Sequence, residues 1–253
     1  MTEMLFRADA YRTEAPGQVV AHTEQGGVVL DASLFYATSG GQPGDRGGLS
    51  WDGGEMDVAT TVKGTGDEIV LVPAEGATLP PVGTAVTQRI DWALRHRHMR
   101  VHTALHLLSV VIPLPVTGGS IGPEKGRLDF DMPEAPEDKA EIEAALNALA
   151  ARDLPVREDW ITEAELDANP GLVKTMSVQP PRGAGHIRLI RIGEGEAQVD
   201  LQPCGGTHVA RTGEIGPLRI GKIEKKGARN RRVNVHLAST TPNASVGCAT
   251  LPR

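Results

Sequence analysis

Residues 91–113 read DWALRHRHMRVHTALHLLSVVIP, and the fold prediction starts from this stretch. Its apolar residues recur every three or four positions, which is the period of a helix with one buried face. Asp91 is a suitable N-cap, and Pro113 ends the helix because proline has no amide N–H to donate. We therefore expect a long amphipathic helix from Asp91 to about Ile112, with a domain junction at the turn of residues 89–91.

Two histidines of this helix share a face. His102 and His106 are four residues apart, about one turn, so both imidazoles can bind the same ion. A second pair with the same spacing, Cys204 and His208, lies far along the chain and brackets Gly205-Gly206. Paired glycines disfavour a helix and favour a tight turn. Because histidine and thiolate suit zinc, these side chains form a candidate zinc site.

Chance does not readily explain these spacings. The 253 residues include only eight His and two Cys, so two matched pairs favour a shared site over unrelated surface or core histidines. Thr103 stands where the HExxH helix of a metalloprotease carries its general base, so we do not expect a protease.

Composition indicates a turn-rich chain from a reducing compartment. Hydrophobic residues make up 40% and aromatic residues 3%, so aliphatic side chains must fill the core. The 30 Gly and 18 Pro favour short strands over a helix bundle. Two distant cysteines give no disulfide framework, and no signal-peptide pattern or long apolar run is visible. We expect a cytoplasmic protein without membrane contact.

The expected fold class is α+β, in two domains. Residues 1–89 alternate short apolar runs with glycine-rich turns, which favours a small β-barrel-like domain. Residues 90–253 should form a second domain of two layers, helices on an antiparallel sheet. Besides the long helix, its expected helices span about 137–152 and 162–169, and its strands span 186–192, 197–201, 218–223 and 232–237. Residues 238–253 are expected to be a frayed tail.

A basic stretch interrupts an otherwise acidic chain. The net charge is −6, yet seven cations and a single acidic residue, Glu224, lie between Arg219 and Arg232. Such a stretch is either a phosphate footprint or a solvated strand and turn, and charge alone does not decide between them.

Residues 35–47, FYATSGGQPGDRG, form a glycine-rich loop. By itself this loop indicates only a turn with exposed amides, because no Gly-Lys-Ser/Thr follows to make a P-loop. Together with IDWALRHRHMRVHTALHLLS, DLQPCGGTHVARTGEIG and KIEKKGARNRR, in this order, it resembles alanyl-tRNA editing domains. The resemblance covers about residues 30–237. Since nothing resembles an aminoacylation core, the chain is similar to freestanding editing proteins of the AlaX class, medium form.

The resemblance implies hydrolysis, in trans, of tRNA for alanine that carries serine or glycine. It implies zinc as cofactor, held by His102, His106, Cys204 and His208. It also implies a catalytic loop of Thr38, Ser39, Gly40, Gly41 and Gln42. Freestanding members typically have threonine where synthetase-embedded versions have an acidic residue. A hydroxyl at Thr38 would hydrogen-bond the serine side chain and disfavour alanine.

The implied partner is the acceptor end of the mischarged tRNA. Its phosphates should contact cations near the site. The candidates are Lys222, Lys225, Lys226, Arg229, Arg231 and Arg232, with Arg95, Arg97 and Arg100 of the long helix as weaker ones.

Several alternatives stay open at this level. Four ligands bound at once would fill a zinc tetrahedron, so water activation requires that one of them, such as His208, stand off or that a fifth ligand be accepted. Otherwise zinc is structural, or the site is metal-free and the histidines act as acid and base. The functional alternatives are a non-catalytic zinc-stabilised RNA-binding module and an editing hydrolase for another aminoacyl-tRNA, such as threonyl-tRNA. The sequence does not indicate an oligomeric state.

Overall fold

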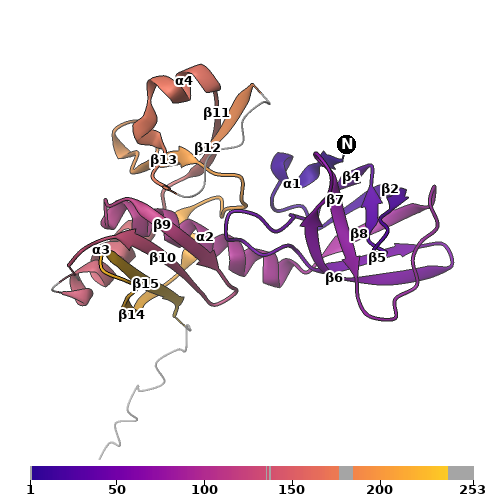
Figure 1. The fold of residues 1–253 in the computed structure, drawn as a ribbon, viewed down its shortest axis with the longest axis horizontal. Coiled ribbons are helices and arrows are strands. Elements are labelled where there is room, and N and C mark those ends of the chain that lie inside the picture. The colour runs from indigo at the N-terminus through magenta and orange to yellow at the C-terminus, as the bar shows by residue number, and fades with distance from the viewer. Residues whose placement is uncertain (1, 135, 137, 177–184, 239–253) are drawn as a thin grey trace, which may run out of the picture.

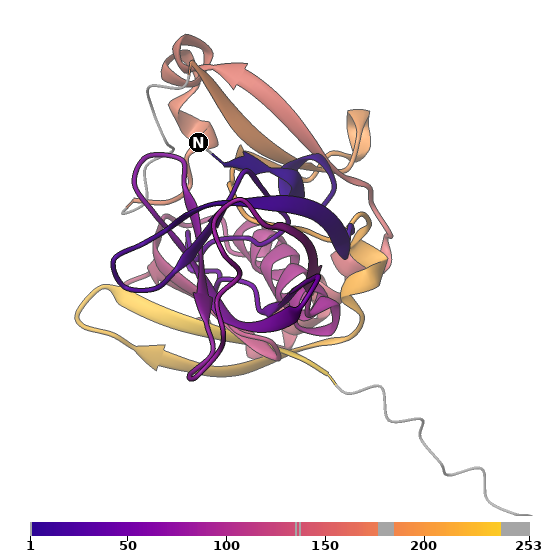
Figure 2. The same ribbon diagram turned by 90° about the vertical axis from the view of Figure 1, so that its right-hand side faces the viewer.

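The N-terminal part of the chain is a closed barrel. The computed structural model describes residues 2–134, 136, 138–176 and 185–238, and Figures 1 and 2 show the barrel and the elements around it. Its antiparallel strands follow the order β2-β3-β7-β6-β5-β8. They are β2 (Glu14–His22), β3 (Val28–Leu30), β5 (Gly47–Trp51), β6 (Gly54–Lys63), β7 (Ile69–Pro73) and β8 (Ala85–Ile90). Before it lie β1 (Glu3–Met4), which pairs with β4 (Ala32–Ser33), and α1 (Leu5–Ala8). The expected barrel is confirmed.

Aliphatic side chains fill the barrel, as the low aromatic content requires. Leu30, Leu49 and Leu71 are each at most 1% exposed. Burial alternates along β6, where Met56 and Val58 point inward between exposed neighbours, as expected of a strand with one face on the core.

The helix α2 (Trp92–Val111) confirms the predicted long helix. The Asp91 carboxylate accepts a hydrogen bond from the Leu94 amide at the start of the helix. The last helical residue is Val111, and Ile112 is the C-cap before Pro113. The expectation of a single buried face is wrong, however, because every residue from Val101 to Ser109 is buried. The helix contacts a sheet, another helix and the segment around β13, and a helix buried all round is a central core element.

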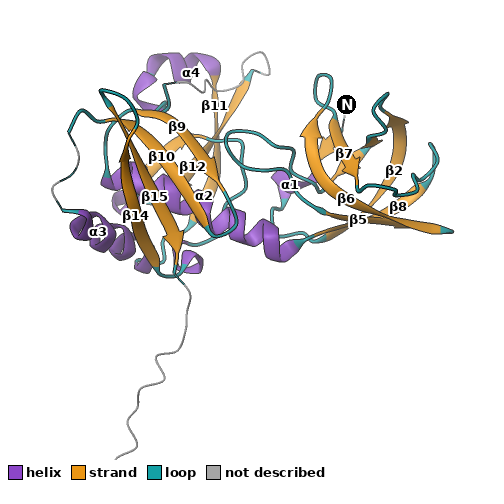
Figure 3. Ribbon diagram, turned by 60° about the horizontal axis from the view of Figure 1, so that its bottom comes forward, coloured by secondary structure: helices purple, strands orange, loops and turns teal. Residues whose placement is uncertain are grey.

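One face of α2 packs on a four-stranded antiparallel sheet (Figure 3). The sheet has the order β14-β15-β10-β9. Its strands are β9 (Val116–Ile121), β10 (Lys125–Asp131), β14 (Leu218–Lys225) and β15 (Asn230–Leu237), and α3 (Lys139–Ala151) packs against α2 and β14. The helix expected at 137–152 is thus confirmed, as are the two C-terminal strands.

A second, three-stranded antiparallel sheet lies beside it. It consists of β11 (Val156–Thr162), β12 (His186–Ile192) and β13 (Asp200–Pro203), with α4 (Glu163–Ala168) against β11 and β12. Thr162 and Glu165 form a capping box, so the helix expected at 162–169 is confirmed. The strand expected at 197–201 begins only at Asp200, because Gly195–Ala197 form a 3₁₀ turn.

The α+β fold class with antiparallel sheets is confirmed, but the strands after residue 112 divide between two sheets instead of forming one layer. The domain division between residues 89 and 90 stays a prediction, since Trp92 packs against both the barrel core and the core around α2. Within the described ranges, no helix combines the length and apolarity needed to cross a membrane. The tail expected at 238–253, with Cys248, lies outside the described residues from 239 onward.

Candidate metal centre

Four side chains from α2 and from the loop after β13 meet beside the barrel. They are His102, His106, Cys204 and His208, and their potential ligand atoms all lie within 4.8 Å of one another. The Cys204 Sγ lies 3.4 Å from His102 Nε2 and 3.3 Å from His208 Nε2. The three histidines are at most 8% exposed. The sequence-predicted ligand pairs therefore do converge, and this cluster can hold a metal ion.

Each histidine of the cluster has its Nδ1 engaged by a partner outside it. His102 Nδ1 lies 2.9 Å from the Gln42 amide oxygen, and His106 Nδ1 lies 2.9 Å from the Asp200 carboxylate. Thr103 donates its hydroxyl proton to the Met99 carbonyl, so at 3.4 Å it can only accept from His208 Nδ1. These partners orient the three rings so that their Nδ1 atoms face outward and their Nε2 atoms face the cluster.

Asp200 anchors a network behind His106 that the sequence motifs did not reveal. Its carboxylate also accepts from Lys174 Nζ at 2.5 Å and from Gln202 Nε2 at 2.7 Å, and it is 3% exposed. Alternation along β13 places Asp200 and Gln202 on one face of the strand. That pattern was the available signal, but the sequence does not show that this face meets α2.

Gln42 connects the barrel loop to both metal motifs. Its amide oxygen accepts from His102 and from the Thr207 backbone N–H, and its Nε2 donates to the Thr207 hydroxyl at 2.8 Å. Gln42 is fully buried. With its amide engaged in this way, Gln42 positions the His102 ring and the 204–208 loop.

Close packing explains one of the glycines between Cys204 and His208. A Cβ on Gly206 would lie 2.3 Å from His102 Cε1 and 2.7 Å from Gln42 Oε1, so no larger residue fits there. Gly205 has open space around it. Arg188 of β12 holds this turn by donating to the carbonyls of Cys204 and Gly206 at 2.8 and 2.9 Å.

The pKa shifts of Cys204 and His208 favour metal ligation, whereas that of His106 means that this ring must release its second proton when a metal binds. Burial raises the pKa of the Cys204 thiol, but His102 and His208 outweigh it and hold that pKa well below its ordinary value. Burial and the neighbouring His102 hold the pKa of His208 well below its ordinary value. Burial lowers the pKa of His106, but hydrogen bonds to Asp200 and Cys204 raise it to about 9. A thiolate beside a neutral imidazole supplies two electron-pair donors.

The glycine-rich loop is closed on itself and docked on β9. The Thr38 hydroxyl donates to the Thr61 carbonyl and accepts from the Gly44 amide, while Ser39 and Gln42 exchange backbone hydrogen bonds. Gly40 and Gly41 take positive φ angles of 56° and 83°, a conformation that favours glycine. The Gly41 carbonyl accepts from the Ile121 amide of β9 at 2.8 Å.

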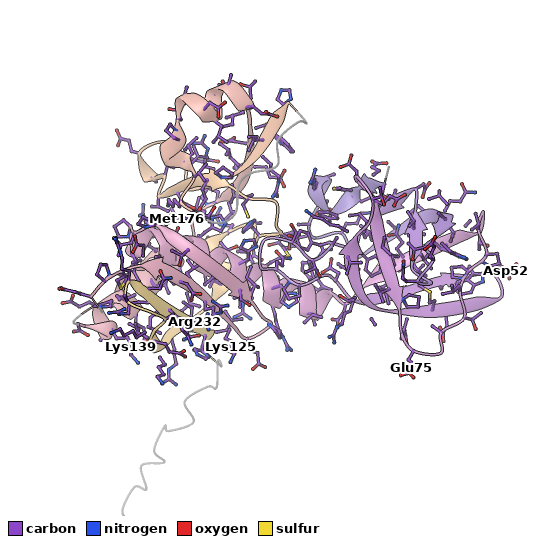
Figure 4. The ribbon with its side chains drawn as sticks, viewed as in Figure 1. Asp52, Glu75, Lys125, Lys139, Met176 and Arg232 are labelled. Carbon is purple, nitrogen blue, oxygen red and sulfur yellow. The ribbon has the colours of Figure 1, made fainter. Side chains whose placement is uncertain are left out.

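The predicted tRNA-binding cations fall into two groups. Lys222, Lys225, Lys226 and Arg229 are exposed on the β14–β15 hairpin. Arg231 is 9% exposed and donates to backbone carbonyls, and Arg232, labelled in Figure 4, pairs with Asp129 at 2.8 Å. The donors of these two are thus partly used within the protein, and so are those of Lys226 and Arg229, which pair with Glu224 and Asp131.

Arg95 of α2 was a weaker candidate for phosphate binding, and that expectation is wrong. It is fully buried in an ion pair with Asp45, itself 2% exposed. Asp45 also accepts from the Tyr36 amide, so the pair fixes the glycine-rich loop to α2. Arg100 donates to the Ile215 carbonyl, whereas Arg97 is exposed.

Comparisons with known proteins match both the N-terminal and the C-terminal part of the chain. The family model of the threonyl and alanyl tRNA synthetase second additional domain matches residues 187–234, and that of class II (A) tRNA synthetases matches residues 8–94. An alanyl-tRNA editing protein AlaX-M of Methanosarcina acetivorans is 36% identical over 92% of this chain and 98% of its own length. The AlaX-M protein of Methanosarcina mazei is 35% identical over 92% of this chain and 95% of its own length. An alanine–tRNA ligase of Pyrobaculum neutrophilum is 37% identical over 88% of this chain but 25% of the ligase.

Proposed function

The chain belongs to the family of AlaX-M alanyl-tRNA editing proteins, and from this premise we propose that it hydrolyses tRNA for alanine mischarged with serine, and also with glycine. The reaction is cleavage of the ester between the aminoacyl carbonyl and the ribose of the acceptor end. The metal is proposed to be zinc, held by His102, His106, Cys204 and His208.

The observation that carries this proposal is the common orientation of the three histidine rings. Each has its Nδ1 within hydrogen-bonding reach of an outside oxygen, and each presents Nε2 to a cluster that also contains a thiol of lowered pKa. Nitrogen and sulfur donors of this kind suit zinc. When bound, zinc supplies a Lewis acid for an ester carbonyl and lowers the pKa of bound water to about 7.

The protein's own groups bring the site together from distant segments. Gln42 joins the barrel loop to His102 and Thr207, and Arg95 with Asp45 joins the same loop to α2. The ester is proposed to bind between this loop and the 204–208 turn, whose rigidity fixes its orientation. The exposed cations of the β14–β15 hairpin are proposed to bind phosphates of the acceptor end.

A second candidate function follows from the number of protein donors. Four ligands complete the usual tetrahedron of a structural zinc site. In that case the protein is a metal-stabilised module that binds alanine tRNA without cleaving it.

Release of labelled serine from Ser-tRNA for alanine tests the two candidates, with Ala-tRNA measured in parallel. Fast release of serine, slow release of alanine and loss of activity in a Cys204→Ala, His208→Ala double variant are expected. Folded protein with one bound zinc that releases no serine would support the binding module instead.

A further inference from the structure

One face of the three-stranded sheet contacts the core around α2 at one end, lies beside the metal centre in its middle and is exposed to solvent at the other end. Ile190 and Ile192 of β12 belong to the core around α2, whereas Ile187 and Leu189 pack with α4. Because side chains alternate along a strand, Arg188 shares the face of Ile190.

Trp160 is placed on this same face by the strand register. It lies directly opposite Arg188 in the β11–β12 pair, and such pairs project to one side of a sheet. Trp160 is 51% exposed, whereas Trp51 and Trp92 are both partly buried. An exposed indole is unusual in a chain with 3% aromatic residues, and it offers a flat surface for a nucleic-acid base.

Arg188 connects this surface to the metal centre. Its Nη1 donates to the carbonyls of Cys204 and Gly206, and its Nη2 pairs with Glu158. Its side chain is 9% exposed, and its buried Nε–H has no hydrogen-bond acceptor among the described residues. Buried donors normally have a partner, so the unpaired Nε points to an acceptor on a ligand.

A second arginine approaches from the N-terminal half. Arg7 lies in α1, and Figure 1 shows α1 on the side of β11 and β12 that faces the barrel. Arg7 is exposed and makes no ion pair within the described part of the chain.

We propose that Trp160, Arg188 and Arg7 form the binding site for the terminal nucleotide of the acceptor end. The indole stacks on the terminal base, Arg188 Nε–H donates to an oxygen of its ribose, and Arg7 binds the adjoining phosphate. This site rests on the proposed function, because it holds the nucleotide whose ribose carries the ester. It also explains how one end of the substrate is fixed beside Cys204, which Arg188 already contacts.

The test compares two substrates in a double-mutant cycle. One is Ser-tRNA for alanine, and the other is the same tRNA with an abasic terminal residue, both charged chemically. For Trp160→Ala we expect kcat/KM to fall roughly 5- to 150-fold on the normal substrate and less than about twofold on the abasic one. Trp160→Phe should recover most of the loss, because a benzene ring still stacks.

Met176→Ala is the matched control. Met176 is 59% exposed, but it lies beside β9, where its amide donates to the Val116 carbonyl (Figure 4). Met176→Ala should leave kcat/KM unchanged on both substrates. Equal losses on the two substrates with Trp160→Ala, or no loss on either, would overturn the stacking assignment.

Binding of an uncharged single-stranded RNA with the same 3′ end separates this site from the hydrolytic activity. Fluorescence anisotropy should show weaker binding for Trp160→Ala and a shallower salt dependence for Arg7→Gln. If the protein releases no serine but binds this RNA through Trp160, the hydrolase proposal fails and the nucleotide site stands. If Trp160→Ala changes neither serine release nor RNA binding, the proposed nucleotide site is wrong and the hydrolase proposal stands.

Discussion

Thr38 has limited freedom to recognise a substrate, because its hydroxyl proton is already donated to the Thr61 carbonyl and one lone pair accepts from Gly44. Its remaining lone pair can only accept a hydrogen bond, and the hydroxyl of a serine substrate is a donor of the right kind. Alanine has no such donor. Selectivity at Thr38 is therefore expected to depend on an acceptor that the loop itself holds in place.

The expected result for Thr38→Val is about a 10-fold smaller preference for Ser-tRNA over Ala-tRNA, whereas Thr38→Ser should retain the preference. Hydrolysis of both charged tRNAs provides the measurement. Thr23→Val is the control, because Thr23 closes a barrel turn in the same way by accepting from the Gly27 amide. Unchanged discrimination in Thr38→Val would remove Thr38 from substrate recognition.

Gln42 offers a second test at a single residue. Gln42→Ala removes the hydrogen bonds that orient His102 and Thr207, so zinc affinity should fall about 10- to 100-fold in competition with a chelator. Gln88 is a matched control, because it is equally buried and bonds to backbone groups in the barrel. Gln88→Ala should lower thermal stability while leaving zinc affinity unchanged. Equal zinc affinity in the two variants would show that Gln42 does not position the ligands.

The four candidate ligands were predictable because each pair is local, with a spacing of four along the chain. Their outer partners were not. Asp200 reaches His106, and Gln42 reaches His102, across 94 and 60 residues of sequence. Arg95 was misplaced for the same reason, since only the folded loop reveals Asp45 as its partner.

At the scale of elements, helices were predicted well and several strands were not. The helix α2 is predicted by the spacing of its apolar residues and by the N-cap Asp91. The helix α4 is predicted by its capping box. The strand β9 contains Gly118-Gly119, and glycines disfavour a strand, while β11 reads VREDWIT, with charged residues at consecutive positions. Pairing with neighbouring strands stabilises both, and that is tertiary context a single sequence does not show.

The β14–β15 hairpin is the element proposed to meet phosphates, and salt dependence tests it. Lys222→Glu with Lys225→Glu should raise KM for Ser-tRNA. The same change should reduce the log–log salt slope by about 0.7 to 0.9 for each lost phosphate contact. Lys63→Glu is the control, because Lys63 is exposed at the end of β6 and its replacement changes the charge by the same amount outside the hairpin. If all three substitutions raise KM equally per charge, the hairpin has no specific role.

At the scale of the whole molecule, two cores meet at α2. The barrel core and the core around α2 share Trp92, and the buried Arg95–Asp45 pair bridges them. Removing one member of such a pair costs about 3–5 kcal/mol, because the other charge is left buried. The metal cluster lies further along α2 and ties this helix to the 204–208 loop, which also contacts the barrel through Gln42.

Metal removal should therefore act unevenly over the molecule. Zinc at 1,000 times its Kd stabilises the folded state by about 4 kcal/mol, and a chelator removes that contribution. Hydrogen exchange should accelerate first at residues 200–209 and in the second half of α2, where the ligands lie. The strands β5 and β6, far from the cluster in sequence and held by their own pairing, should keep their protection. A uniform rise in exchange would mean that the barrel and the part of the chain after residue 90 unfold together. The boundary predicted between residues 89 and 90 would then not divide the chain into separately stable units.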